Sequence, residues 1–197
     1  FEMRTKLCLP SNFFFSRGQV NLDDFNGWAK KKFEGKQSFV LISNEGAGEV
    51  TPQTVQAKID QHKPDIVICD YHQLFTDNRK SSSIVERNRN ISSEFKQMAI
   101  RNNIPIIDIT AATMDDVSDQ DNPPMLSQVA WSKAIEYDAD MAFAVHKTQG
   151  TNIIEVVSRK NRHGQEFDFY LDWDINRGVI SPIYENLPEM KNDSSKN

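Results

Sequence analysis

A chain of 197 residues with 38% hydrophobic and 26% charged residues is long enough to bury one sizeable core and predicts a globular protein with a polar surface. No apolar run approaches the length that spans a bilayer, and the net charge of −5 argues against extensive nucleic-acid wrapping, although a local basic groove stays possible. The two cysteines, Cys8 and Cys69, lie far apart without metal-ligand spacing, which predicts reduced core thiols in a cytoplasmic protein.

The first quarter of the chain predicts helices with one short strand between them. Two helical pieces come first, and Asp23 and Asp24 occupy a position typical of a helix start. An apolar strand is expected over 37–43, followed by a loop whose glycines lack the spacing of a phosphate loop. The next helix, over 51–62, begins with Thr51 as its cap.

Three apolar runs predict the central strands. The first, DIVICD at 65–70, ends abruptly on an acid, and the others lie at 104–110 and 139–147. Because their apolar residues do not alternate with polar ones, we expect these strands to be buried on both faces. A polar loop at 76–83 and an amphipathic helix at 84–103 separate the first two strands. The residues expected to face inward on this helix are Ile84, Ile91, Phe95 and Met98.

The last part of the chain begins with a long acidic loop at 114–125 and a helix predicted over 126–138. NIIEVVSRK and EFDFYLDWD are then expected to pair as antiparallel strands, joined by the glycine-bearing turn NRHGQ. We expect a core of residues 1–180 and a polar, disordered tail at 181–197. Strands that alternate with helices predict an α/β fold, with a mostly parallel sheet, helices on both faces and a final antiparallel hairpin.

Polar side chains follow several of these strands at the edge where such sheets bind ligands. Asp70 ends the first strand, the Thr110 region follows the second, and Lys160 and Arg162 lie just past a later strand. An acid at a strand end is either a turn residue or a ligand for a metal ion. These residues therefore form the candidate site.

Several segments occur in a specific order along the chain. They are FEM at 1–3, DIVICDYHQLF at 65–75, NNIPIIDIT at 102–110, AIEYDADMAFAVHK at 134–147 and VVSRKNRHGQ at 156–165. Their most specific parts are Asp-Tyr-x-Gln-Leu, IExDAD and KxRxG. From residue 1 to about residue 175, the chain resembles the C-terminal RecA-like ATPase domain of the DnaB-like hexameric replicative DNA helicases, including their bacteriophage relatives.

The resemblance implies a role for each matching residue. Asp70 matches the Walker B aspartate, which holds Mg²⁺ through water beside the phosphates of ATP. Glu2 matches the acid that polarises the attacking water as a general base. Lys160 and Arg162 match the basic pair that is offered to the ATP of a neighbouring subunit, with Arg162 as the arginine finger.

The implied function is that of an ATP-dependent DNA helicase motor, which hydrolyses ATP at subunit interfaces and translocates on single-stranded DNA. A finger supplied in trans implies a homo-oligomer, in this family a hexameric ring, with primase or a helicase loader as further partners and no membrane contact. In the loop at 76–83, Arg79 and Lys80 are the candidate DNA contacts. The acidic loop at 114–125 fits a subunit or partner contact instead. The implied location is the cytoplasm of a bacterium, or of the host for a bacteriophage protein.

Three features depart from the family pattern. The phosphate-loop sequence GxxxxGK[ST] occurs nowhere in the 197 residues, and in the family it precedes the position of Phe1. The glutamine that senses the γ-phosphate is replaced by Ala111 or Thr113, depending on the alignment. The segment VAWSK stands where the bacterial helicases usually have an Arg-Glu-Ser-like stretch.

These departures leave two alternatives open. The chain fits a degenerate RecA-like module that binds DNA or a ring partner without ATPase activity, which the missing phosphate loop favours. It also fits another RecA-like ATPase, such as a recombinase or a clock-type relative, which DYHQL and KNRHG disfavour. His72 and His146 have no partners at metal spacing, so both are expected to serve in packing or hydrogen bonding.

Overall fold

The computed structural model describes residues 21–35, 40–42, 48–79, 81–112, 122–128, 133–175 and 177–183. The chain splits into two compact units, the first made of Phe1–Val40, Lys147–Glu155 and Phe169–Asn197, and the second of Leu41–His146 and Val156–Asp168. Three predicted site residues, Glu2, Lys80 and Thr113, lie outside the described residues. None of the helices in the described ranges has the length and hydrophobicity needed to cross a membrane.

The first unit contains helix α2 (Leu22–Phe33). The side chain of Asn21 caps this helix by accepting hydrogen bonds from the backbone N–H groups of Asp23 and Asp24. The expected helix start is therefore confirmed. In the same unit, the end of β5 (Asp168–Asp174) pairs antiparallel with β6 (Val179–Pro182), a short strand that the sequence pattern did not predict.

The second unit begins its regular structure with α3 (Pro52–His62), as expected. Thr51 and Thr54 form a reciprocal capping box, and Pro52 occupies the first helical position, where its missing N–H costs nothing. The expected strand over 37–43 is not seen in its described part, since Val40, Leu41 and Ile42 have no regular structure and are exposed.

Strands β1 (Val67–Asp70) and β2 (Ile106–Ile109) form a parallel pair. Their register places Asp70 opposite Ile109, so the carboxyl ends of both strands meet at one edge. The 3₁₀ turn η1 (His72–Leu74) follows β1, and α4 (Ile84–Asn102) leads back to β2.

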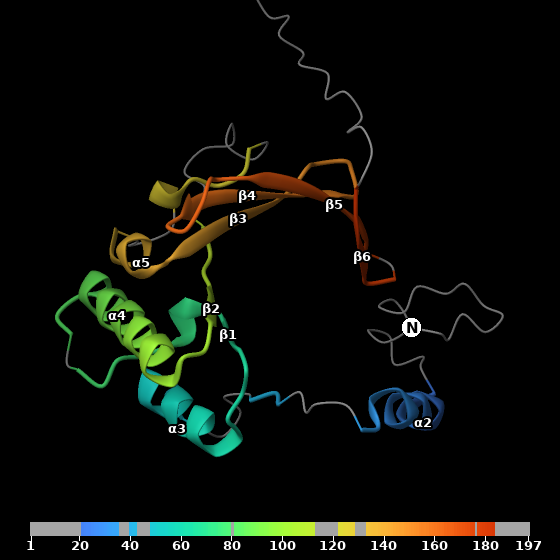
Figure 1. The fold of residues 1–197 in the computed structure, drawn as a ribbon, viewed down its shortest axis with the longest axis horizontal. Coiled ribbons are helices and arrows are strands. Elements are labelled where there is room, and N and C mark those ends of the chain that lie inside the picture. Colours follow the sequence, from blue (N-terminus) through green and yellow to red (C-terminus); the bar gives the residue numbers. More distant parts are fainter. Residues whose placement is uncertain are drawn as a thin grey trace, which may run out of the picture. The chain divides into compact units, whose positions relative to one another are not determined.

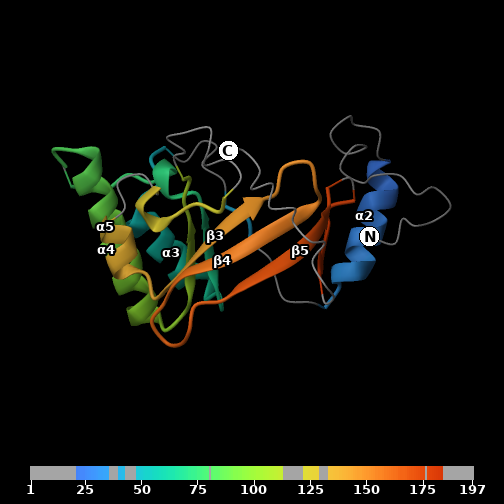
Figure 2. The ribbon, with the colours of Figure 1, turned by 90° about the horizontal axis from the view of Figure 1, so that it is seen from above.

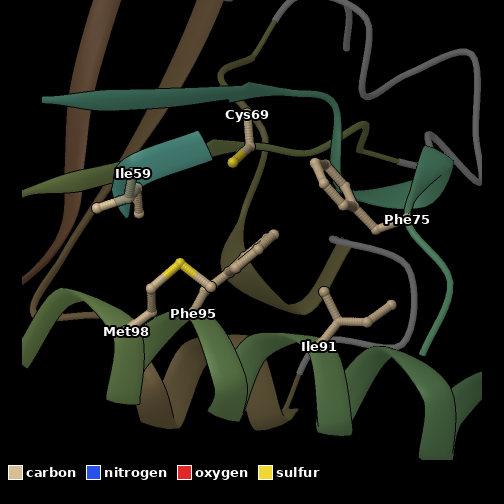
Figure 3. Packing of buried hydrophobic residues seen from close by; sticks show 6 residues of the cluster. All are labelled: Ile59, Cys69, Phe75, Ile91, Phe95 and Met98. Atoms are coloured by element: carbon tan, nitrogen blue, oxygen red, sulfur yellow. The ribbon is translucent and has the colours of Figure 1, made fainter. Parts of the chain in front are cut away.

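One face of this strand pair is covered by α3 and α4, which form the hydrophobic core with it (Figure 3). The buried core residues are Ile59, Cys69, Phe75, Ile91, Phe95 and Met98. The expected inward residues of α4 are confirmed except Ile84, which is 48% exposed. Ile84 is the first residue of α4, one turn or more before the residues that reach the sheet, so its side chain lies beyond the core.

The other face of β1 and β2 is not buried, which contradicts the expectation for these strands. Ile68 and Ile107, which lie opposite each other, are 57% and 47% exposed, whereas Cys69, the next residue along β1, is buried. Successive side chains of a strand point to opposite faces, and in the described residues helices cover one face of this pair. An unbroken apolar run therefore does not by itself show burial on both sides.

The 3₁₀ turn η3 (Leu126–Gln128) and helix α5 (Lys133–Asp138) form the described parts of the helix expected over 126–138. Helix α5 packs against α4, as both views show (Figures 1 and 2). Strand β3 (Met141–Lys147) follows, and its burial alternates. Ala144 and His146 are buried, whereas Met141, Phe143 and Val145 on the opposite face are exposed. Burial of β3 on both faces is therefore also contradicted.

Strands β3, β4 (Ile153–Asn161), β5 and β6 form a four-stranded sheet in that order. The N–H of Ser158 donates to the carbonyl of Phe167, and the N–H of Trp173 donates to the carbonyl of Asn152. From Asn152, just before β4, to Ser158 within it, the bonded residue on the β5 side falls from Trp173 to Phe167, so the two strands run antiparallel. The expected hairpin of β4 and β5 is confirmed.

Candidate functional site

Asp70 is the last residue of β1 and is exposed to solvent. Its carboxylate makes no hydrogen bond or ion pair with any residue that the structure describes. By contrast, Asp108 on the neighbouring strand pairs with His72, and Asp77 in the loop before α4 accepts from Asn90 and Ser81. Asp70 is therefore an acid at a ligand-binding edge whose oxygens are available to a ligand.

The segment that follows Asp70 is fixed to β2 by two side-chain contacts. His72 Nδ1 lies 2.6 Å from Asp108 Oδ2, and Gln73 Nε2 donates to Thr110 Oγ1 at 3.0 Å. His72 is 1% exposed, and its ring meets that of Phe95 edge to face. The prediction that His72 serves in hydrogen bonding and packing is confirmed, and the contact with Asp108 holds the turn after β1 in place.

These two contacts were missed by sequence reasoning, although the sequence held a signal for one of them. Asp108 interrupts the apolar run IPIIDIT, and a carboxyl within a strand of the core needs a partner. The residue at one of the two possible sensor positions, Ala111, has no polar side chain, whereas Gln73 places an amide beside the neighbouring Thr110.

Cys69 and His146 are both buried, and in the described residues neither belongs to a group of side chains that could hold a metal ion. Burial, and then the nearby Asp108 charge, raise the pKa of the Cys69 thiol to about 12, so this cysteine is neutral and unreactive at neutral pH. His146 is buried in β3. Within the described ranges, no three His, Cys, Asp or Glu side chains are grouped so that they could hold a metal ion.

Lys160 and Arg162 meet at the carboxyl end of α5. The ammonium group of Lys160 donates to the backbone carbonyls of Glu136 and Tyr137, and Arg162 also donates to the carbonyl of Tyr137. The last carbonyls of a helix have no partner within the helix and carry partial negative charge, so cations stabilise this end. Burial, followed by the Arg162 charge, lowers the pKa of Lys160.

Asp140 joins this cluster through two cations. Lys96 Nζ lies 2.5 Å from one carboxylate oxygen, and Arg162 Nη1 lies 3.4 Å from the other. The hydrogen bond from Lys96 is the main reason why the pKa of Asp140 is below its usual value. Since Asp138 also accepts a 2.8 Å hydrogen bond from Ser92, the acids of the DAD sequence tie α5 and the start of β3 to α4.

Arg79 lies in a network that connects its loop to α4. Its guanidinium contacts Glu94 and Asn90, both at 3.4 Å, while Asn90 also donates to Asp77 at 2.8 Å. Burial raises the pKa of Asp77, but the hydrogen bonds from Asn90 and Ser81 and the nearby arginines outweigh it and lower the pKa overall. The side chain of Arg79 is nevertheless largely exposed, so it is accessible to a ligand.

The predicted site residues therefore form separate groups. Lys160 and Arg162 lie together, Arg79 lies within the loop before α4, and Asp70 has no bond to any of them among the described residues. Mg²⁺ needs few protein ligands, because waters and substrate phosphates complete its octahedral shell. A single free carboxylate at a strand end fits such an ion.

Comparison with known proteins gives a family match and several relatives. Residues 12–177 match the model of the DnaB-like helicase C-terminal domain. A probable plasmid replicative DNA helicase of Chlamydia trachomatis serovar L2 is 31% identical over 128 residues, which cover 62% of this chain and 27% of that protein. The replicative DNA helicase DnaC of Bacillus subtilis is 29% identical over 107 residues, which cover 50% of this chain and 24% of that protein. The chain thus spans about a quarter of the length of these curated relatives.

Solved structures agree with this match. One solved ATPase domain has a TM-score of 0.74 at 21% identity, covering 89% of this chain and 66% of its own length, which shows a shared fold. A DnaB-like replicative helicase, solved in a study of its interactions with primase, has a TM-score of 0.63 at 25% identity. The match covers 68% of this chain and 36% of that structure's chain. The predicted RecA-like α/β fold class is confirmed. The chain belongs to the DnaB-like helicase C-terminal domain family.

Proposed function

We propose that this chain is the ATPase motor domain of a replicative DNA helicase, which in its intact form hydrolyses ATP at subunit interfaces and translocates on single-stranded DNA. The observation that carries the proposal is the exposed carboxylate of Asp70 at the carboxyl edge of β1, which has no hydrogen bond or ion pair in the part of the chain that the structure describes. The naming of the matched relatives as replicative DNA helicases supports it.

In this proposal, Asp70 holds Mg²⁺ through bound water. The ion, when bound, supplies positive charge that neutralises the β- and γ-phosphates of ATP. The contacts of His72 with Asp108 and of Gln73 with Thr110 keep the residues after Asp70 fixed to β2. Asp70 therefore needs little rearrangement to meet its ligand. Glu2, the proposed general base, lies outside the described residues and stays a prediction.

Arg162 is the proposed arginine finger, with Lys160 beside it. A guanidinium has five N–H donors, and the contacts of Arg162 with Tyr137 and Asp140 leave donors unused. Its side chain is partly exposed, so these donors can reach the ATP of a neighbouring copy. A finger acting in trans requires a homo-oligomer, which we propose to be a hexameric ring in the cytoplasm.

Primase and a helicase loader are the proposed further partners, and Arg79 and Lys80 are proposed DNA contacts. The proposal of primase as a partner is supported by the structural neighbour that was solved in a study of its interactions with primase. The exposed guanidinium of Arg79 supports the DNA contact, whereas Lys80 lies outside the described residues.

Subunit mixing tests this proposal, using protein expressed from the complete gene. Arg162→Ala alone is expected to keep nucleotide binding but lose at least about 10³-fold in hydrolysis rate, because the finger meets charge that develops in the transition state. Asp70→Asn alone is expected to lose hydrolysis because its own nucleotide site is defective. Mixed rings regain activity where an Asp70→Asn subunit supplies its intact Arg162 to the nucleotide site of an Arg162→Ala subunit. Normal hydrolysis by Arg162→Ala, or no recovery on mixing, contradicts a finger in trans.

The alternative function is a degenerate RecA-like module that binds DNA or a ring partner and has no ATPase activity. Ala111, which stands at one of the two possible positions of the sensor glutamine, favours it. In that case the wild-type protein from the complete gene shows no Mg²⁺-dependent ATP hydrolysis, while its binding to single-stranded DNA is retained.

A further inference from the structure

A cleft of about 560 Å³ lies between α4 and α5, with the loop before α4 at its rim. One wall carries Arg89 and Ser93, which are four residues apart on α4. The other carries Lys133 and Tyr137, which have the same spacing on α5. Residues four apart share one face of a helix, so each helix presents a short row of side chains to the cleft.

The charges along this cleft are mainly positive and only partly neutralised. Arg89 and Lys133 are exposed, and neither forms an ion pair or hydrogen bond with any residue in the described ranges. Arg79 adds a third cation, whose position is set by Glu94. The acid in the lining, Asp138, is already an acceptor for Ser92.

The cleft also has an aromatic surface. Tyr137 is 77% exposed, although a large ring of this kind is usually at least half covered in a folded protein. Its backbone carbonyl is held by Lys160 and Arg162, so the main chain that carries the ring is fixed. Cations next to an exposed ring are the combination that binds single-stranded nucleic acid, where phosphates meet the charges and a base stacks on the ring.

We propose that the cleft between α4 and α5 binds a segment of single-stranded nucleic acid, with Arg79, Arg89 and Lys133 at its phosphates and Tyr137 stacked on a base. The proposal rests on the helicase function proposed above and deepens it, since it extends the contact surface from the loop at Arg79 to the faces of two helices. The net charge of −5 makes the protein as a whole repel nucleic acid, so binding depends on this local cluster.

Fluorescence anisotropy of a labelled oligothymidine, titrated with the full chain without ATP or Mg²⁺, tests the proposal. The logarithm of the association constant for single strands falls linearly with the logarithm of the salt concentration, with a slope of about 0.7 per phosphate contact. The double variant Arg89→Ala with Lys133→Ala is expected to bind more weakly and to lose about 1.4 from that slope, two contacts at about 0.7 each. The matched control carries Arg101→Ala, which removes an exposed cation from the last turn of α4, away from the cleft, and should leave the slope unchanged.

Two variants of Tyr137 separate base stacking from charge attraction. Tyr137→Ala is expected to weaken binding about tenfold, whereas Tyr137→Phe keeps the ring and should bind as the wild type does. Because Tyr137 is exposed and its hydrogen bonds use the backbone carbonyl, neither change removes a contact of the fold.

Three results would overturn the cleft proposal: no binding by the wild-type chain, equal salt slopes for the double variant and Arg101→Ala, or displacement by inorganic phosphate or an acidic peptide as readily as by unlabelled oligothymidine. Failure of the ATPase proposal gives a different pattern. In that case the wild-type protein from the complete gene shows no Mg²⁺-dependent ATP hydrolysis, while the oligonucleotide titration still shows the expected effects, because no nucleotide is present in it.

Discussion

The edge of β1 and the corner between α5 and β3 use their charged residues in opposite ways. At the edge of β1, Asp70 ends the strand and bonds to none of the described residues, whereas His72 and Asp108 bond to each other. At the corner, the cations Lys160 and Arg162 both donate to the carbonyl end of α5.

This difference separates residues that are available as they stand from residues that also hold the fold together. Asp70 can accept a ligand without breaking a hydrogen bond or ion pair to any residue that the structure describes. Arg162 can use its remaining donors, but full release would break its bonds to the carbonyl of Tyr137 and to Asp140. A motif match therefore says which residues to examine, and their contacts say which of them are free to act on a ligand.

The largest expected effect comes from the core that supports the edge of β1. Phe95→Ala removes the ring that packs against His72 and Phe75 and should lower the free energy of unfolding by about 3–5 kcal/mol. The matched control, Ile100→Ala, changes a residue of the same helix that is 60% exposed and should cost less than about 1 kcal/mol. Urea denaturation measures both, and equal losses would contradict the assigned core.

The next effect tests the two acids at the edge of β1 against each other. Asp108→Ala leaves buried His72 without its partner and should lower the free energy of unfolding by about 1–3 kcal/mol. Asp70→Ala removes an exposed side chain that has no hydrogen bond or ion pair in the described residues, and it should change the free energy of unfolding by less than about 0.5 kcal/mol. The comparison between the two acids fails if both substitutions destabilise the protein by the same amount.

A smaller effect is expected at the corner, where Asp140 is only half-buried. Replacing it with Asn should cost about 0.5–1 kcal/mol at neutral pH, since its partners Lys96 and Arg162 are themselves partly exposed. The folded pKa of Asp140 is below its usual value, so this stabilisation is present above about pH 5 and is lost as the pH falls below about 4. Unfolding curves of wild type and variant should therefore converge in acid, and a gap that persists at low pH would count against the ion pairs.

Much of the fold around Asp70 could be predicted from local patterns. Capping and apolar spacing located α3 and the inward residues Ile91, Phe95 and Met98 of α4, because these signals act within one helix. Burial of the strands on both faces was wrong at Ile68 and Ile107, because burial depends on what lies across the sheet, which a single strand does not encode.

The candidate site was predictable at Asp70 because its position at a strand end is a local property of the sequence. The contacts of Lys160 and Arg162 with α5 were not predictable, since they join residues more than 20 positions apart through tertiary packing. The pairing of His72 with Asp108 joins the turn after β1 to β2, and only the acid within IPIIDIT indicated it.

The most direct test of the account compares Asp70→Asn with Asp65→Asn in protein expressed from the complete gene. Asp65 is an exposed acid just before the same strand, so the second variant removes the same charge nearby. Both variants should unfold at wild-type urea concentrations. We predict that Asp70→Asn abolishes Mg²⁺-dependent ATP hydrolysis and that Asp65→Asn leaves it unchanged. Near-normal turnover by Asp70→Asn would contradict the assignment of Asp70 as the residue that holds the metal ion.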